Sequence, residues 1–214
     1  MNKFMVSLIA ITLLSGCKVE LAPTVNLSDV QSETAKTVQS KILIEVSSCT
    51  DFKDSRQESS TLIKAKNEIQ KIFADAKYIE CYREKMDSKA VFEIPIMVGG
   101  KTGNGDIQIR NNESGGMVVE MSKKLEQKIS NHQNSTFRKI NTSISINVNN
   151  DLNQAQQIIG YAIYLDNNAI PVSKYDLKPG QHTIKLSDVS VSAILTKGSA
   201  LVYENANDSI DTKN

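Results

Sequence analysis

The spacing of apolar residues along the chain predicts one amphipathic helix and a series of short strands. Between residues 59 and 77 apolar side chains recur every three to four positions, which places them on one face of a helix. Between residues 140 and 149 they alternate with polar ones, as in a strand with one buried and one solvated face. Val38–Val46 shows the same alternation ahead of the helix. This pattern predicts a main helix that packs on an antiparallel sheet.

The second half of the chain consists mostly of residue patterns that are typical of strands. A short second helix is expected within residues 123–132, and strands are expected at 91–98, 107–110, 117–121, 158–165, 183–186, 189–195 and 200–203. Pro95 favours an edge or a bulge, because proline cannot donate a hydrogen bond to a neighbouring strand. The stretch Tyr161–Leu186 resembles small β-sandwich repeats of exported bacterial proteins. We therefore expect an α+β fold: one main helix stapled to an antiparallel sheet, with a mostly β, β-sandwich-like C-terminal half.

The first seventeen residues, MNKFMVSLIAITLLSGC, have the pattern of an export signal. Lys3 precedes an apolar run from Phe4 to Leu14, which is shorter than the ~20 residues that a membrane-spanning helix needs. A positive start, a short apolar core and small residues ahead of a cleavage point are typical of a signal peptide. The run ends in four residues that resemble the lipobox of bacterial lipoproteins, namely Leu14, Ser15, Gly16 and Cys17.

The lipobox resemblance implies that the signal is cleaved before Cys17 and that the Cys17 sulfur carries a diacylglycerol. Each buried CH₂ of such chains contributes ~0.8 kcal/mol, so the protein would be anchored to a membrane without crossing it. A non-lipidated secretory signal with a chance cysteine is the alternative. The next residue is Lys18, whereas an Asp there commonly retains lipoproteins on the inner membrane. The resemblance thus implies the outer membrane and leaves open whether the domain faces the periplasm or the cell surface.

These observations predict the division of the chain. Residues 1–16 are expected to be the signal peptide, and residues 17–35 the lipidated cysteine and a polar tether. Residues 36–204 are expected to be globular, either as one unit or as two subdomains of about 36–135 and 136–204. Residues 205–214 are polar and are expected to form a flexible tail.

Cys49 and Cys81 remain as a pair once Cys17 is assigned to lipid. Oxidising compartments favour a disulfide between two such cysteines in an exported chain. Closing a loop of this length would stabilise the domain by ~3–4 kcal/mol. A zinc site would need further ligands at short spacings, and a redox pair would need C-x-x-C, so both are weaker interpretations. The bridge is expected to join the end of the 59–77 helix to the preceding strand.

Residues that could carry out catalysis are scarce. The 25 basic and 24 acidic residues nearly balance, which argues against a nucleic-acid partner. Gly99-Gly100-Lys101-Thr102 resembles part of a phosphate loop, but such a loop needs a glycine where Pro95 stands and a helix afterwards. His132 and His182 are the only histidines, and no G-x-S-x-G motif surrounds a serine. We expect no catalytic residue, no metal and no cofactor.

The start LLSGCKVEL, the later stretch KILIEVSSC and a second cysteine after a helix are together similar to small lipoproteins carried by phages and bacterial genomes. The resemblance implies a role at the host envelope, such as blocking a receptor. We therefore expect a membrane-anchored, non-catalytic binding or masking module whose partner is an outer-membrane protein or another envelope component. The alternatives are a structural or assembly lipoprotein of an envelope complex, and a hydrolase with an unrecognised site.

Overall fold

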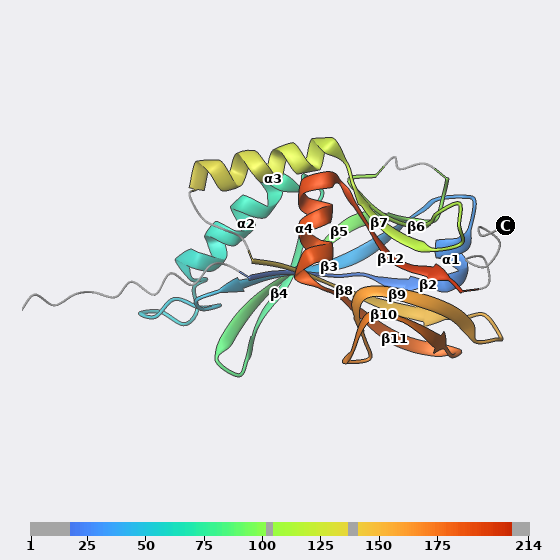
Figure 1. The fold of residues 1–214 in the computed structure, drawn as a ribbon. Coiled ribbons are helices and arrows are strands. Elements are labelled where there is room, and N and C mark those ends of the chain that lie inside the picture. The colour runs from blue at the N-terminus through green and yellow to red at the C-terminus, as the bar shows by residue number, and fades with distance from the viewer. Residues whose placement is uncertain (1–17, 102–104, 137–140, 207–214) are drawn as a thin grey trace, which may run out of the picture.

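The computed structural model describes residues 18–101, 105–136 and 141–206, which form twelve strands and four helices (Figure 1). The helices are α1 (Leu27–Gln31), α2 (Ser60–Ile72), α3 (Lys123–Thr136) and α4 (Asp188–Lys197). The strands are β1 (Lys18–Ala22), β2 (Thr24–Asn26), β3 (Lys36–Val46), β4 (Lys77–Glu84), β5 (Asp87–Val98), β6 (Ile107–Asn111), β7 (Met117–Met121), β8 (Asn141–Asn150), β9 (Gln156–Leu165), β10 (Asn168–Leu177), β11 (Gly180–Leu186) and β12 (Ser199–Asn205).

All twelve strands belong to one mixed sheet. Its main path runs β1-β3-β5-β6-β7-β12-β9-β11-β8-β2, with β4 beside β5 and β10 beside β9. β1 also pairs with β8, in parallel, so the sheet curls round until β1 and β8 meet. Helices α2, α3 and α4 pack against this sheet (Figure 1). Apolar side chains of the sheet and of these helices form one internal core.

The predicted fold class is wrong. The structure has four helices rather than one main helix, and the sheet is mixed because β1–β8, β2–β8 and β5–β6 are parallel pairs. The C-terminal strands do not form a sandwich of their own, since β8 pairs with β1 and β12 pairs with β7. The inward-facing apolar residues of both halves of the chain share one hydrophobic core. Burying them together removes more apolar surface from water than two separate small cores would.

The tether predicted between residues 17 and 35 is also corrected. From Lys18 onward these residues form β1, β2 and α1, and Leu21, Val25 and Leu27 are buried. Asp151 fixes the start of α1, because its carboxylate accepts hydrogen bonds from the Ser28 amide (2.9 Å) and the Ser28 hydroxyl (2.5 Å). Two strands of three to five residues are too short to show a clear period in sequence. The globular fold therefore begins at residue 18.

The flexible tail predicted for residues 205–214 is corrected at its first two residues. Asn205 is the last residue of β12 and Ala206 is buried, whereas residues 207–214 lie outside the described part of the chain.

The strand predicted over Val38–Val46 is confirmed as the C-terminal part of β3. The helix predicted after it is also confirmed, but it ends before residue 77. Ser59 caps the start of α2, because its hydroxyl oxygen accepts a hydrogen bond from the Leu62 amide at 3.1 Å. The helix ends at Ile72, and the chain turns into β4, a strand that the sequence pattern did not predict.

The disulfide between Cys49 and Cys81 is present, with 5.6 Å between the two Cα atoms. It joins the loop after β3 to β4, not to the end of the helix, because α2 has already ended and Cys81 lies within the strand.

Pro95 lies in an interior strand, but at a point where one side of that strand is unpaired. β5 pairs with β3 over its whole length, and β4 reaches only as far as Glu93 on the other side. On that side, pairing begins again at Met97, where β6 is the neighbouring strand. The local edge predicted from the proline therefore exists inside the sheet.

The strand predicted at 189–195 is wrong, because these residues form α4. Ser187 accepts the Ser190 amide at its N-terminus, and Gly198 adopts a left-handed conformation at its C-terminus. The alternation in VSVSAIL suggested a strand, whereas the two caps mark a helix.

Candidate binding site: an apolar cavity between sheet and helices

A cavity of about 310 Å³ lies between the curled sheet and helices α2, α3 and α4. Its sheet wall is formed chiefly by apolar side chains and one threonine from five strands: Val19, Leu21, Ile42, Ile44, Val46, Ile107, Val119, Met121, Thr142 and Ile144. Small-molecule sites are typically apolar clefts of ~300–1,000 Å³ with a few polar groups. This cavity lies at the lower end of that range.

The helix wall is formed chiefly by the amphipathic face that the sequence predicted for α2. Ala65 and Ile69 are buried on this face and Ile72 is partly buried, while Leu125 and Ile129 approach from α3. The prediction that this face belongs to the core is confirmed. The same residues also line the cavity, so one face of α2 belongs both to the core and to the cavity wall.

A few charged groups occupy the wall between α2 and α3. His132 Nδ1 lies 3.4 Å from Glu68 Oε2, and Glu68 Oε1 accepts a hydrogen bond from Lys71 Nζ at 3.0 Å. The Glu68 carboxylate therefore links the two helices. Lys64 also lines the cavity and is exposed, and no ion pair involving it occurs in the described part of the chain.

A second ion pair stiffens the sheet beside the cavity. Arg110 donates to both carboxylate oxygens of Glu120, at 2.9 and 2.6 Å, and Glu120 contributes to the lining. The Glu120 carboxylate raises the pKa of the Arg110 guanidinium. This bidentate pair locks β6 to β7 and keeps that part of the wall in place.

The two histidines lie in different parts of the fold, and only His132 reaches the cavity. His182 lies in β11, where its Nδ1 is 2.7 Å from Asp166 Oδ2 and its Nε2 is 2.8 Å from the Lys178 carbonyl oxygen. Both contacts tie together neighbouring turns. The geometry therefore gives His182 a structural role.

The glycines of the candidate phosphate loop are used inside the fold. The Gly99 amide donates to the Ile109 carbonyl at 2.9 Å, and the Gly100 amide donates to the Ser32 carbonyl at 2.8 Å. A phosphate loop must point such amides at its ligand, so this segment does not fit that role. Thr102 lies outside the described residues.

The lipobox residues Leu14, Ser15, Gly16 and Cys17 also lie outside the described residues, so lipidation stays a prediction. Within residues 18–101, 105–136 and 141–206, no three or more His, Cys, Asp or Glu side chains cluster in a way that could hold a metal ion. None of the helices in these ranges is both long enough and apolar enough to span a bilayer.

The cavity was not predicted from the sequence. A periodic apolar face looks the same whether its neighbours fill the space against it or leave a gap. The one available signal is Ala65, a small side chain in the middle of the α2 apolar face.

The chain belongs to the family described as "Domain of unknown function (DUF7424)", whose model matches residues 19–208. The match spans nearly all of the described fold and starts two residues after Cys17. Neither a curated protein nor a solved structure matches the chain.

Proposed function

We propose that this protein is a membrane-anchored envelope lipoprotein that binds one apolar chain, such as the acyl chain of a lipid, in the cavity between sheet and helices. The observation that carries the proposal is the cavity itself, which is apolar on the strand side and on three helices. Binding in this site requires no reaction, in keeping with the non-catalytic role expected from the sequence. Masking of an outer-membrane protein stays a prediction.

The composition of the lining supports an apolar ligand. Most of the side chains that line the cavity are Val, Leu, Ile, Ala, Met or Phe, and these offer water no hydrogen bonds. An apolar chain that packs against them is removed from water, which is favourable by ~25 cal/mol per Å² of apolar surface buried.

Lys64 favours an amphiphile with an anionic head group. The three glutamates of the lining, Glu45, Glu68 and Glu120, are each paired with a basic side chain. Lys64 is exposed, has no such partner among the described residues and can form an ion pair with a carboxylate or phosphate. The apolar chain would then lie against Ala65 and Ile69, which line the same cavity.

Photolabelling tests this proposal in the native membrane. A fatty acid with a diazirine at the end of its chain is added to isolated membranes that contain the full-length protein, and labelled peptides are mapped by mass spectrometry. We expect label on α2 and α3 residues that face the cavity. Ala65→Leu should reduce this labelling severalfold, because its larger side chain occupies the cavity.

Ala76→Leu is the matched control. Ala76 is as buried as Ala65, with 7% and 8% of the residue exposed, but it does not line the cavity. Overpacking at Ala76 should cost ~1–3 kcal/mol of stability and leave the labelling pattern unchanged. Ala65→Leu should cost less, since it enters an existing space. Label distributed over the outer surface, or equal labelling of wild type and Ala65→Leu, would refute the binding proposal.

A further inference from the structure

The N-terminus of the fold, a stapled loop and a hairpin tip lie at the same end of the sheet. Lys18 pairs with β3 next to Glu45, and its ammonium lies 3.3 Å from the Glu45 carboxylate. β3 then ends at Val46, which pairs with Ser88 near the start of β5. The start of β1 at Lys18, the loop after β3 and the turn between β4 and β5 therefore lie at the same end of the sheet.

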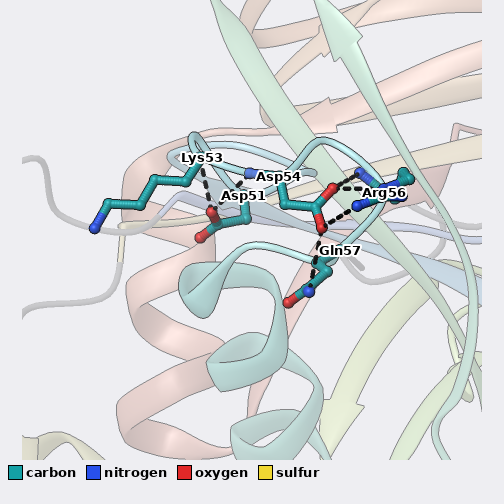
Figure 2. Close-up of polar contacts among 5 residues, drawn as sticks. All are labelled: Asp51, Lys53, Asp54, Arg56 and Gln57. Carbon is teal, nitrogen blue, oxygen red and sulfur yellow. Dashed lines mark hydrogen bonds and ion pairs between the residues drawn. The ribbon is translucent and has the colours of Figure 1, made fainter.

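The loop between Cys49 and Ser59 is rigidly built. The disulfide holds it to β4, and an isolated bridge pairs Thr50 with Glu58 across its base. The Asp51 amide donates to the Gln57 carbonyl at 2.9 Å, and the Asp51 carboxylate accepts the Lys53 amide at 2.8 Å. Figure 2 shows how these polar residues fold the loop back on itself.

Asp54 completes the loop. Its carboxylate accepts two hydrogen bonds from the Arg56 guanidinium, at 2.9 and 3.0 Å, and one from the Gln57 side chain at 3.3 Å (Figure 2). The bond to Arg56 lowers the pKa of the Asp54 carboxyl. The loop is thus held by hydrogen bonds among its own residues and by the disulfide to β4.

This rigid loop presents an aromatic side chain to solvent. Phe52 is completely exposed, at 102%, and Met86 at the tip of the β4–β5 hairpin is 85% exposed. They are the two most exposed large apolar side chains in the described ranges. A flexible loop could turn a phenylalanine inward, whereas one fixed by a disulfide and a carboxylate network keeps it outside.

Each of the two apolar tips has a lysine on one side and an aspartate on the other. Lys53 and Asp51 flank Phe52, Lys85 and Asp87 flank Met86, and both lysines are exposed. The Asp51 carboxylate is used inside the loop, where it accepts the Lys53 amide. An apolar side chain flanked by a cation suits the boundary of a bilayer, where the apolar group enters the acyl region and the ammonium reaches the phosphates.

We propose that Phe52 and Met86 insert into the bilayer to which Cys17 is anchored, so that this end of the sheet rests directly on the membrane. The inference rests on the lipid anchor of the proposed function, and the missing tether makes it specific. Because β1 starts at Lys18, acyl chains on Cys17 would have no spacer, and the exposed tips nearest to them would meet the same surface. The lipid surface, rather than a protein partner, is the occupant that the position of Lys18 favours.

The absence of tryptophan from the chain permits a clean test. Phe52→Trp and Met86→Trp each place a single tryptophan at a tip, and Val172→Trp places one in β10 as a control, at an exposed position that is not part of this edge. Each full-length lipoprotein is reconstituted into vesicles of phosphatidylethanolamine and phosphatidylglycerol, with or without brominated acyl chains. Emission spectra and co-sedimentation with the vesicles are measured.

We expect the two tip variants to emit at shorter wavelength than the control and to be quenched by the brominated lipids, while Val172→Trp is not. Sedimentation of all three variants without quenching at the tips would overturn the insertion and leave the anchor intact. Failure of all three to sediment would overturn the anchor and the insertion together. Neither result alters the photolabelling of the cavity, which tests the ligand separately.

Discussion

Gly99 is a residue whose lack of a side chain holds the N-terminal segment on the sheet. Its φ of +75° is in the left-handed region, and a Cβ there would lie 2.4 Å from the Asp29 carbonyl oxygen. The Gly99 carbonyl in turn accepts a hydrogen bond from the buried Gln108 side chain at 2.5 Å. The backbone directly after β5 thus approaches α1 more closely than any larger residue would allow.

Replacing Gly99 by alanine should therefore destabilise the fold more than the same change at Gly180. Both glycines have positive φ, so both variants carry backbone strain of ~1–3 kcal/mol. A Cβ at Gly180 meets nothing within 4 Å, so only Gly99→Ala adds a steric conflict, worth about 1 kcal/mol or more. Thermal unfolding of both variants measures the difference, and equal losses would show that the contact with Asp29 is not tight.

A single distant residue also explains why the tether predicted at residues 17–35 was wrong. Asp151 lies 123 residues from Ser28, yet its carboxylate fixes the helix that follows β2. Burial acts to raise the pKa of this carboxyl, but the hydrogen bonds from Ser28 prevail and lower it. Nothing local to Ser28 reveals this partner, so the segment looked like a polar linker.

At the scale of elements, the disulfide is the feature that the sequence predicted best. Its two cysteines are 32 residues apart and join the loop after β3 to β4. This bridge holds the base of the Phe52 loop against β4, which pairs with β5. The pairing could be predicted because the expected export and lipidation at Cys17 leave a single possible pair.

We predict that the double variant Cys49→Ala, Cys81→Ala loses about 3–4 kcal/mol of unfolding free energy, because the unfolded chain gains the entropy of the opened loop. Urea unfolding followed by circular dichroism measures this loss. Wild-type protein in reducing agent should match the double variant, and reducing agent should leave the double variant unchanged. An unaltered unfolding midpoint would contradict the stabilising role of the bridge.

The other elements divide by the strength of their local signal. β3 and α2 have long periodic patterns and were predicted, and α2 also has a capping serine. α4 was mistaken for a strand because alternation over a few residues fits either period, and only its caps Ser187 and Gly198 distinguish them. β4 is almost wholly exposed and therefore shows no apolar alternation at all.

At the scale of the whole molecule, closure of the sheet was beyond the reach of sequence patterns. Lys18 pairs with Asn141, and this contact brings together the two halves that were expected to be separate. Periodicity shows which face of a strand is buried but not which strand is its neighbour. The cavity depends on the same closure, since its wall combines residues from β1 and β8 with three helices.

Together, the predicted anchor, the cavity and the exposed tips lead us to propose a domain that lies on a membrane and binds an apolar chain from it. The β1 segment belongs to the sheet, so the anchor would hold the domain close to the lipid rather than at the end of a spacer. A binding site for acyl chains would then be next to the source of its ligand. This arrangement is what we propose for the whole molecule.

Native mass spectrometry of the full-length protein released from membranes tests that claim most directly, with Ala65→Leu measured beside the wild type. We predict a wild-type mass that exceeds the covalent lipoprotein by one apolar molecule, which organic solvent removes and which Ala65→Leu lacks. A wild-type protein that carries no additional molecule, or one retained equally by Ala65→Leu, would contradict the account.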